Sequence, residues 1–582
     1  MVNLIPKVKI IEEKTGFSNK KAICCTFELQ DERLKKAVAK LPQSNEGVKL
    51  NIDICGNNGE NYELFINEES IDIKAGGASG AFYAIQTLRQ IFKTENVPCL
   101  YINDKPDFKH RGFYHDITRG KVPTVETLKK LIDEMAYYKM NSLQLYVEHT
   151  FEFEEYKGVS EKTGYLTAKE MQELDAYCEE NFIEFIPSLS TFGHLYELLQ
   201  QEKYQHLRVL KDFENKPNFW RSRMAHHTID PLNEESFELI KNLIDQYIPN
   251  FKSEYFNICC DETFDLKVYD NMGYDSGKLY LEFVSKIIDY MSEKGKKTMM
   301  WADIVLEHPE VIKDMPNDIC LLNWYYNEDV PEEKIAQLAK AGKKQILCPG
   351  TTTWNRLCEK VDTEEKNISL MAEYGMKYGA DGILNTNWGD WANPCSIDLA
   401  MYGLVLGAEK SWSAETELND EFYANVNAVL YENENGFECL KKLSDMHNLI
   451  KWVDFCSTYC YSRYGNEEDK VSAPFTMLAE IQKAYLELKD KLSAEKWVND
   501  EYRQEMLISA EGLCVMAELM IKRQSGNVER LTDTKEWLKK YSEKWNLKNK
   551  KSELYNIEEM FNYCEENYYF KSFKRLTIKS QV

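Results

Sequence analysis

Two adjacent carboxyl groups, Asp261 and Glu262, are the residues of this chain best suited to acid–base chemistry. They follow residues 255–260, Tyr-Phe-Asn-Ile-Cys-Cys, an apolar run typical of a buried strand. Two carboxylates desolvated at a strand tip repel each other, so one holds its proton to a higher pH than a free acid does. Such an acid can protonate a glycosidic oxygen. An isolated Asp-Glu pair is more often structural. In this chain it could pair with Lys267 or cap the next helix, so the catalytic interpretation depends on the residues around the pair.

Basic residues elsewhere in the chain could assist this acid. The guanidinium of Arg111 could grip two adjacent hydroxyl groups, although a salt bridge at the base of the fold is the alternative. His194, in the run Ser-Leu-Ser-Thr-Phe-Gly-His, could tune the pKa of a carboxylate or could be a satisfied core histidine. The pair His226-His227 has no carboxylate at ligand spacing, so we expect no metal site there.

Tryptophans and polar residues fall mostly at the C-terminal ends of short apolar, strand-like runs. The tryptophans are Trp301, Trp324, Trp354, Trp388 and Trp391. The polar residues are Asp116, His149, Asp261, Glu262, Asp303, Asn323 and Asp390. Aromatic walls with a few polar groups suit a sugar, whose C–H face stacks on rings while its hydroxyl groups need hydrogen bonds.

The elements that must position these residues alternate between short apolar strands and amphipathic helices. The eight strand-like runs are GFYHDIT, SLQLYVEH, EFIPSLST, YFNICCDE, KTMMWADI, ICLLNWYY, QILCPGTT and GILNTNWG. Between them, residues 125–138 carry a helical apolar stripe, and Thr167 with Glu170 forms a capping box. This alternation predicts an α/β fold, a (β/α)₈ TIM barrel over residues 106–410, whose active site lies at the carboxyl ends of the strands.

Different patterns flank the predicted barrel. Residues 48–75 alternate with a period of two, which predicts a strand pair, and a helix follows at 76–92. We therefore expect a small α/β domain over residues 1–105. Beyond 411 the helical period persists, as in 472–492, 502–523 and 551–566, so residues 411–582 are predicted to form a helical C-terminal domain.

Composition narrows the choice of partners and location. The net charge of -24 argues against binding to nucleic acid or to an anionic membrane. There is no signal-peptide pattern and no run of 18 apolar residues, and 16 cysteines would be hazardous in an oxidising compartment, so we expect a cytoplasmic protein. Serine-hydrolase, nucleotide-binding and zinc-protease motifs are absent from the sequence, and we expect no cofactor.

These motifs resemble those of glycoside hydrolase family 20, the β-N-acetylhexosaminidases, over roughly residues 60–410. Residues 61–92 are similar to the family's auxiliary domain, and the stretch KPDFKHRGFYHDITRG to its first-strand motif, in which the resemblance makes Arg111 the ligand of the terminal sugar's hydroxyl groups. Phe192-Gly193-His194 resembles the third-strand motif, and Asp261-Glu262 the catalytic pair. Trp301, Trp324 and Trp388 resemble the pocket tryptophans, and Asp390 stands where the family usually has a glutamate.

The resemblance implies a retaining mechanism in which the substrate's own 2-acetamido oxygen is the nucleophile. Asp261 would orient the acetamide, and Glu262 would act first as acid and then as base. The chain departs from the family at Glu148, where paired aspartates are usual, and it lacks a clear counterpart of the tyrosine that holds the acetamide carbonyl. Trp354, Tyr325 and Tyr326 are the candidates.

Three functions follow as hypotheses. The first is an exo-acting hydrolase that removes terminal β-linked N-acetylglucosamine or N-acetylgalactosamine from a small oligosaccharide or glycoside. The second is a glycosidase on the same scaffold that acts on a different sugar without acetamide participation. The third is a sugar-binding protein without turnover, against which the retained Asp261-Glu262 pair argues.

Overall fold

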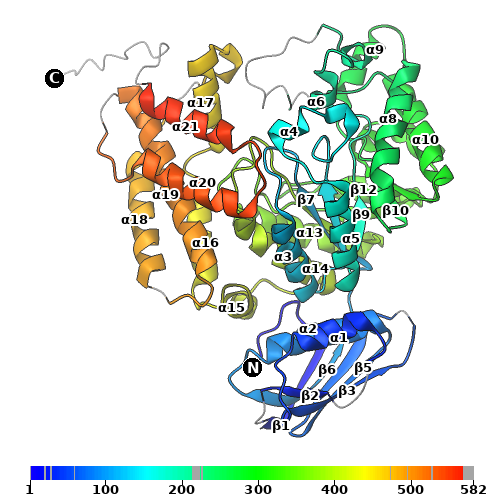
Figure 1. Ribbon diagram of the computed structural model, residues 1–582, viewed down its shortest axis with the longest axis vertical. Helices are drawn as coiled ribbons and strands as arrows, with labels where there is room; N and C mark the ends of the chain where they lie inside the picture. Colours follow the sequence, from blue (N-terminus) through cyan, green and yellow to red (C-terminus); the bar gives the residue numbers. More distant parts are fainter. Residues whose placement is uncertain are drawn as a thin grey trace.

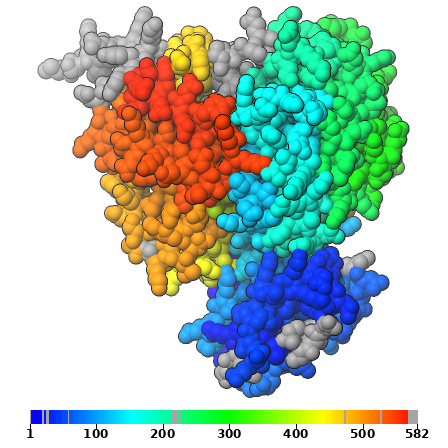
Figure 2. All heavy atoms as spheres, in the orientation of Figure 1, coloured from blue at the N-terminus to red at the C-terminus, as the bar shows by residue number. Residues whose placement is uncertain are grey.

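The computed structural model describes residues 2–567 apart from 19–20, 26–28, 58, 213–222, 224–226, 472–473, 495 and 526–527. Figure 1 shows three parts: an N-terminal sheet with helices on one side, a barrel, and a helical C-terminal part packed beside the barrel. The N-terminal part projects as a separate lobe in the space-filling view (Figure 2). No helix among the described residues combines the length and the apolar character that a membrane crossing requires.

The N-terminal part is a six-stranded sheet in the order β1-β6-β4-β5-β3-β2. Its strands are β1 (Ile10–Ser18), β2 (Ile23–Cys25), β3 (Val48–Ile54), β4 (Tyr62–Ile66), β5 (Ser70–Ala75) and β6 (Val97–Asp104), and its helices are α1 (Glu32–Ala39) and α2 (Ala78–Ile91). The predicted strand pair over 48–75 is three strands, because residues 48–54 pair with β5 from the side opposite to β4. The helix expected at 76–92 is α2.

The barrel is an eight-stranded parallel sheet in the order β10-β11-β12-β13-β14-β7-β8-β9. Its strands are β7 (His110–Asp116), β8 (Ser142–Tyr146), β9 (Glu184–Pro187), β10 (Tyr255–Asn257), β11 (Lys297–Trp301), β12 (Cys320–Trp324), β13 (Lys344–Cys348) and β14 (Gly382–Asn387). A parallel bridge between Ser188 and Asn257 joins the two ends of this order. The prediction of a TIM barrel is confirmed, and each of the eight strand-like runs contains one of these strands.

Helices follow the barrel strands. They are α3 (Val125–Tyr137), α4 (Ser160–Thr163), α5 (Ala168–Glu180), α6 (Tyr196–Leu199), α8 (Glu234–Tyr247), α9 (Lys267–Asp270), α10 (Ser276–Glu293), α11 (Asp303–Glu307), α12 (Glu332–Lys340), α13 (Val361–Tyr378) and α14 (Met401–Trp412). Of these, α3, α5, α8 and α10 begin at a residue whose side chain caps them. The capping box predicted at Thr167 and Glu170 is present at the start of α5. The side chain of Asp275 accepts from the backbone of Lys278 and starts α10 in the same way.

The C-terminal part is helical, as predicted. Its helices are α15 (Asp420–Val426), α16 (Gly436–His447), α17 (Trp452–Tyr464), α18 (Leu478–Ala494), α19 (Asp500–Ser525), α20 (Thr534–Lys548) and α21 (Leu554–Glu566). The chain after α20 returns to the barrel, where the backbone N–H of Lys550 donates to the carbonyl of Val122. In Figure 1 these helices lie along one side of the barrel. The C-terminal part is therefore tied to the loop that follows the first barrel strand.

The interior of the barrel is filled by large side chains below the carboxyl ends of the strands. This cluster comprises Tyr114, Tyr146, Ile186, Cys259, Met299, Trp301, Cys320, Leu322, Ile346, Cys348, Leu384 and Trp388. Because the interior is packed rather than open, a ligand can enter only at the mouth. The rings of Trp301 and Trp388 form the top of this cluster, with centroids 5.8 Å apart, and so form the floor of any site above it.

Candidate active site

A cavity of about 230 Å³ opens at the carboxyl ends of the barrel strands. It is lined by Arg119, Asp261, Glu262, Trp301, Trp324, Tyr326, Trp354, Asn355, Trp388 and Asp390. Eight of the residues selected from the sequence therefore share one cavity: Asp261, Glu262, Trp301, Trp324, Tyr326, Trp354, Trp388 and Asp390. A mainly aromatic wall with charged groups at one side suits a single sugar ring.

The backbone that carries Asp261 and Glu262 is not a strand at that point. β10 ends at Asn257, and the chain turns through left-handed conformations at Cys259 (φ 57°), Cys260 (φ 65°) and Glu262 (φ 49°). Left-handed backbone is costly for residues with a Cβ atom, so the surroundings must hold it in place. One such contact runs from the backbone N–H of Glu262 to Asp303 Oδ2, at 2.9 Å.

Asp303 is a carboxyl group with a raised pKa at the edge of this cluster. Burial, with the neighbouring charges of Asp261 and Glu262, raises the pKa of Asp303 to about 8. The alternative partner considered for the Asp-Glu pair, Lys267, instead pairs with Glu307 at 3.6 Å. The acidic pair thus faces the cavity rather than a surface lysine.

His194 lies between the acidic pair and the rest of the polar network. Its Nε2 atom is 3.2 Å from Asp261 Oδ2 and 3.3 Å from Glu262 Oε2. On the other side of the ring, Nδ1 is 3.9 Å from Glu148 Oε1. Burial by itself lowers the pKa of His194, but Asp261 and Glu262 outweigh it and raise that pKa to about 10. His194 is only 3% exposed, and it contacts both members of the pair.

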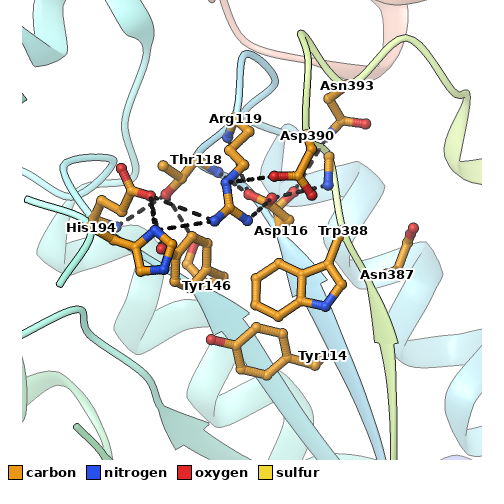
Figure 3. A network of polar contacts seen from close by, with 12 residues as sticks. Tyr114, Asp116, Thr118, Arg119, Tyr146, His194, Asn387, Trp388, Asp390 and Asn393 are labelled. Carbon is orange, nitrogen blue, oxygen red and sulfur yellow. Dashed lines mark hydrogen bonds and ion pairs between the residues drawn. The ribbon is translucent and has the colours of Figure 1, made fainter. Parts of the chain in front are cut away.

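Arg119 is the cation on the charged side of the cavity, 3.5 Å from Nδ1 of His194, and sequence reasoning missed it. Its guanidinium lies 3.0 Å from Asp116 Oδ2 and 3.4 Å from Asp390 Oδ1. The plane of the guanidinium stacks over the rings of Tyr146 and Trp388, at 4.6 Å and 5.0 Å. Figure 3 shows Arg119 between Asp390, Asp116 and His194. The signal was present in the sequence, because Arg119 follows the end of a strand, where a barrel carries its site.

The assignment of Arg111 as a sugar ligand is wrong. Arg111 stands near the start of β7, so it lies at the opposite end of the barrel from the cavity. It is fully buried and forms an ion pair with Glu60 of the N-terminal part, at 2.9 Å. Its guanidinium also stacks over the ring of Trp412, at 5.1 Å. Arg111 therefore joins the barrel to the N-terminal part. This is the salt bridge at the base of the fold that the sequence offered as the alternative.

Two of the three candidates for the missing tyrosine, Tyr326 and Trp354, line the cavity, and only Tyr326 carries a hydroxyl group. The ring of Tyr326 stacks on Trp324 at 5.0 Å, and its hydroxyl oxygen accepts from Trp388 Nε1 at 2.7 Å. Tyr325 packs instead into a separate cluster with Val330 and Ile335, outside this wall. Trp354 lines the cavity against Tyr326, with ring centroids 5.2 Å apart. Tyr326 is thus the tyrosine that brings a hydroxyl group to this wall.

Other polar or aromatic residues expected at the mouth lie elsewhere. His149 is buried against the ring of Tyr156, and Asn323 donates to Gln345 inside the barrel. Trp391 is not among the residues that line the cavity, and its carbonyl accepts from Trp452. Of the histidine pair, His226 lies outside the described residues and the ring of His227 contacts Tyr196. His149 and Asn323 lie near strand ends in the sequence, but neither lines the cavity.

The loop after β14 carries Asp390, and the C-terminal helices hold it. Three successive residues, Trp391, Ala392 and Asn393, have positive φ values of 60°, 79° and 48°. Trp452 Nε1 donates to the carbonyl of Trp391 at 2.9 Å, and the hydroxyl of Tyr541 donates to the carbonyl of Pro394 at 2.9 Å. The helical C-terminal part thus fixes a strained loop at the cavity rim.

Comparisons with known proteins agree with this geometry. Residues 108–413 match the model of the glycosyl hydrolase family 20 catalytic domain, and residues 4–105 match that of glycosyl hydrolase family 20, domain 2. A β-hexosaminidase of Porphyromonas gingivalis is 25% identical over 361 residues, which cover 52% of this chain and 46% of the relative. A β-hexosaminidase of Akkermansia muciniphila is 31% identical over 156 residues, or 23% of this chain and 31% of the relative. The chain spans about half or less of the length of these relatives.

Solved structures share the fold. The exo β-N-acetylglucosaminidase of Vibrio harveyi, in complex with N-acetylglucosamine, has a TM-score of 0.57 at 21% identity, covering 73% of this chain and 75% of that one. The chitobiase of Flavobacterium johnsoniae has a TM-score of 0.61 at 17% identity and covers 96% of this chain and 99% of that one. The second match extends over the helical C-terminal part as well as the barrel.

Proposed function

The chain belongs to glycosyl hydrolase family 20, and we propose that it is an exo-acting β-N-acetylhexosaminidase that removes terminal β-linked N-acetylhexosamine from small oligosaccharides or glycosides. One observation carries the proposal: Asp261 and Glu262 lie together beside His194 at the edge of an aromatic cavity large enough for one sugar ring. Binding alone has no need of such an acidic pair.

The proposed reaction is retaining and uses no nucleophile from the protein. The oxygen of the substrate's acetamide attacks the anomeric carbon, the glycosidic bond breaks, and the leaving oxygen takes a proton from Glu262. The oxazolinium-like intermediate is stabilised by the carboxylate of Asp261. Water then attacks the same carbon, Glu262 takes its proton, and the acetamide is restored. Two displacements at one carbon retain its configuration.

Tyr326 is the residue that we assign to the acetamide carbonyl. Its hydroxyl oxygen accepts from Trp388 Nε1, so its own proton is available to donate. The rings of Trp301, Trp324 and Trp388 surround the same space and suit the acetamide methyl group. The role that the family gives to a tyrosine after the seventh strand would here fall to one after the sixth, β12.

The charged side of the cavity supports the exo mode. Arg119 and Asp390 are bonded to each other, and Asp116 and Gly389 tie them to the ends of β7 and β14. These paired charges offer both donors and acceptors to the outer hydroxyl groups of a terminal sugar. Because ion pairs close this side of the cavity, an oligosaccharide cannot extend beyond the terminal sugar in this direction without breaking them.

A panel of aryl glycosides tests the function. We expect hydrolysis of 4-nitrophenyl β-N-acetylglucosaminide or β-N-acetylgalactosaminide, with proton NMR of the first-formed sugar giving the β anomer. Glu262→Gln provides the matched inactive control for contaminating activity. Preferred turnover of a sugar without the acetamide would favour a different glycosidase on this scaffold. Tight sugar binding with no turnover of any member would favour a binding protein.

A cytoplasmic location is part of this proposal. It is supported by the number of thiols: the chain has 16 cysteines, and most of those described are buried as small apolar groups. Thiol counting under denaturing, non-reducing conditions on freshly isolated native protein should titrate nearly all of them. Several disulfide bonds in that sample would contradict the location.

A further inference from the structure

Three side chains at the edge of the cavity place metal-ligating atoms at the spacing of a coordination shell. We propose that His194, Asp261 and Glu262 form a binding site for a divalent transition metal such as Zn²⁺, and that the bound metal inhibits the enzyme by occupying its acid–base pair. One nitrogen and two carboxylate oxygens of these residues all lie within 4.8 Å of one another.

The two separations from His194 fit tetrahedral zinc. Zinc bonds of about 2.0–2.1 Å to nitrogen and oxygen place neighbouring ligand atoms roughly 3.3 Å apart. The two separations from His194 Nε2 are 3.2 Å to Asp261 Oδ2 and 3.3 Å to Glu262 Oε2. The ion can therefore take the place of the proton shared by these groups with little movement. A water molecule from the cavity would supply the fourth ligand.

The ligand chemistry selects the kind of metal. An imidazole with two carboxylates suits Zn²⁺, Cu²⁺ or Ni²⁺, whereas Mg²⁺ and Ca²⁺ prefer oxygen alone. The Glu148 carboxylate, 3.9 Å from Nδ1 of the same ring, can orient the imidazole from behind. Asp261 also has a second oxygen, Oδ1, that is buried without a hydrogen-bond partner among the described residues. A cation would offset the charge concentrated here.

A second cluster of the same spacing serves as an internal contrast. Asp398, Glu501 and Glu505 also bring their carboxylate oxygens within 4.8 Å. The ammonium group of Lys548 already binds all three of them, as a cation built into the chain. Metal binding there would require the displacement of Lys548. At the cluster of His194, the guanidinium of Arg119 contacts Nδ1 of the ring, 3.5 Å away, and not the Nε2 atom that would bind the ion. The Glu262 side chain is 24% exposed, which gives an ion a route from the cavity.

Metal binding itself follows from the three ligands, whereas competitive inhibition rests on the proposed function. The test uses the full chain, reduced, with the exposed Cys55 replaced by serine so that a surface thiol does not compete. Zn²⁺ binding is measured by calorimetry, and Co²⁺ is used as a spectroscopic substitute. We expect one site of micromolar or tighter affinity and the visible absorption of four-coordinate Co²⁺, with no binding of Mg²⁺.

Variants decide where the metal sits. His194→Gln and Asp261→Asn should each weaken Zn²⁺ binding at least tenfold, and Asp398→Asn, the matched control in the other cluster, should leave it unchanged. Absence of saturable binding, or binding that survives His194→Gln, would overturn the proposal. In the activity assay Zn²⁺ should raise KM without changing kcat, reversibly with EDTA. If the protein binds Zn²⁺ at His194 but cleaves no glycoside, the metal site stands and the proposed function is refuted. If it is active but binds no Zn²⁺, the proposed function stands and the metal site is refuted.

Discussion

Arg119 lies 3.4 Å from Asp390 at the mouth of the barrel, while Arg111, eight positions earlier in the same segment, lies at its base against Glu60. The two arginines should therefore differ in their effect on activity. Arg119→Ala removes charged hydrogen bonds to the sugar and should reduce kcat/KM by roughly a hundredfold, about 3 kcal/mol, at a temperature where the variant is folded. Its Tm should also fall, because the buried Asp116 loses its partner.

Arg111→Met is the matched control for that variant. It leaves Glu60 without its partner in a buried ion pair, so the free energy of unfolding should fall by about 3 kcal/mol. At a temperature where the variant is folded, kcat/KM should stay within about threefold of the parent. Steady-state kinetics and thermal unfolding of both variants check this. A large loss of activity in folded Arg111→Met would restore it as a substrate ligand.

Tyr541 should control the binding of substrate from a distance. Tyr541→Phe deletes only the hydroxyl that donates to the Pro394 carbonyl, so the strained loop that carries Asp390 should become looser. We expect KM to rise by roughly three- to tenfold, while Tm changes by only a degree or two. The control is Tyr459→Phe, which removes a hydroxyl bound to Glu559 within the C-terminal part. An equal effect of both variants on KM would show that the loop contact is not the cause.

Two buried acids, Glu359 and Glu364, should make stability depend on pH. Burial raises the pKa of Glu359 to about 8 and holds the pKa of Glu364 well above its usual value. In the unfolded chain both groups lose their protons near pH 4.5, while the folded chain keeps them bound. Folding is thus favoured below pH 4.5, and this contribution is lost as the pH rises towards 8.

Glu364→Gln should remove much of that dependence, because the amide needs no proton to remain neutral and can donate to Glu359. We expect the variant to gain about 2 kcal/mol relative to the parent at pH 8 and almost nothing at pH 5. Urea denaturation at both pH values measures the difference. The exposed Glu373→Gln on the same helix is the control. A parent whose stability did not change between pH 5 and 8 would contradict the assignment.

Much of the architecture could be predicted because it follows from repetition. Eight apolar strands alternating with amphipathic helices have few other arrangements, and the strand ends brought Asp261, Glu262 and Asp390 to one cavity. The prediction that failed was Arg111 as a sugar ligand, and it depended on which end of a barrel strand the residue occupies. Arg111 and Arg119 lie in one motif, and only the rule that sites gather at strand carboxyl ends separates them.

Features that depend on tertiary contacts could not be predicted. The three left-handed residues around Glu262 make the chain leave the ladder at Asn257, so the apolar run looked like a longer strand than it is. The choice of Tyr326 over Tyr325 depends on which of two adjacent side chains turns inward after β12, a matter of one residue in register. The contact of Tyr541 with the Asp390 loop joins residues 147 positions apart.

The central claim is that the substrate's acetamide is the nucleophile, and one comparison tests it most directly. kcat/KM is measured for a 4-nitrophenyl β-N-acetylhexosaminide and for the same glycoside with a hydroxyl group in place of the 2-acetamido group. Because a tethered nucleophile is worth an effective concentration of about 10⁵ M or more, the hydroxyl substrate should react at least roughly a thousandfold more slowly. Equal or faster cleavage of the hydroxyl substrate would contradict the account.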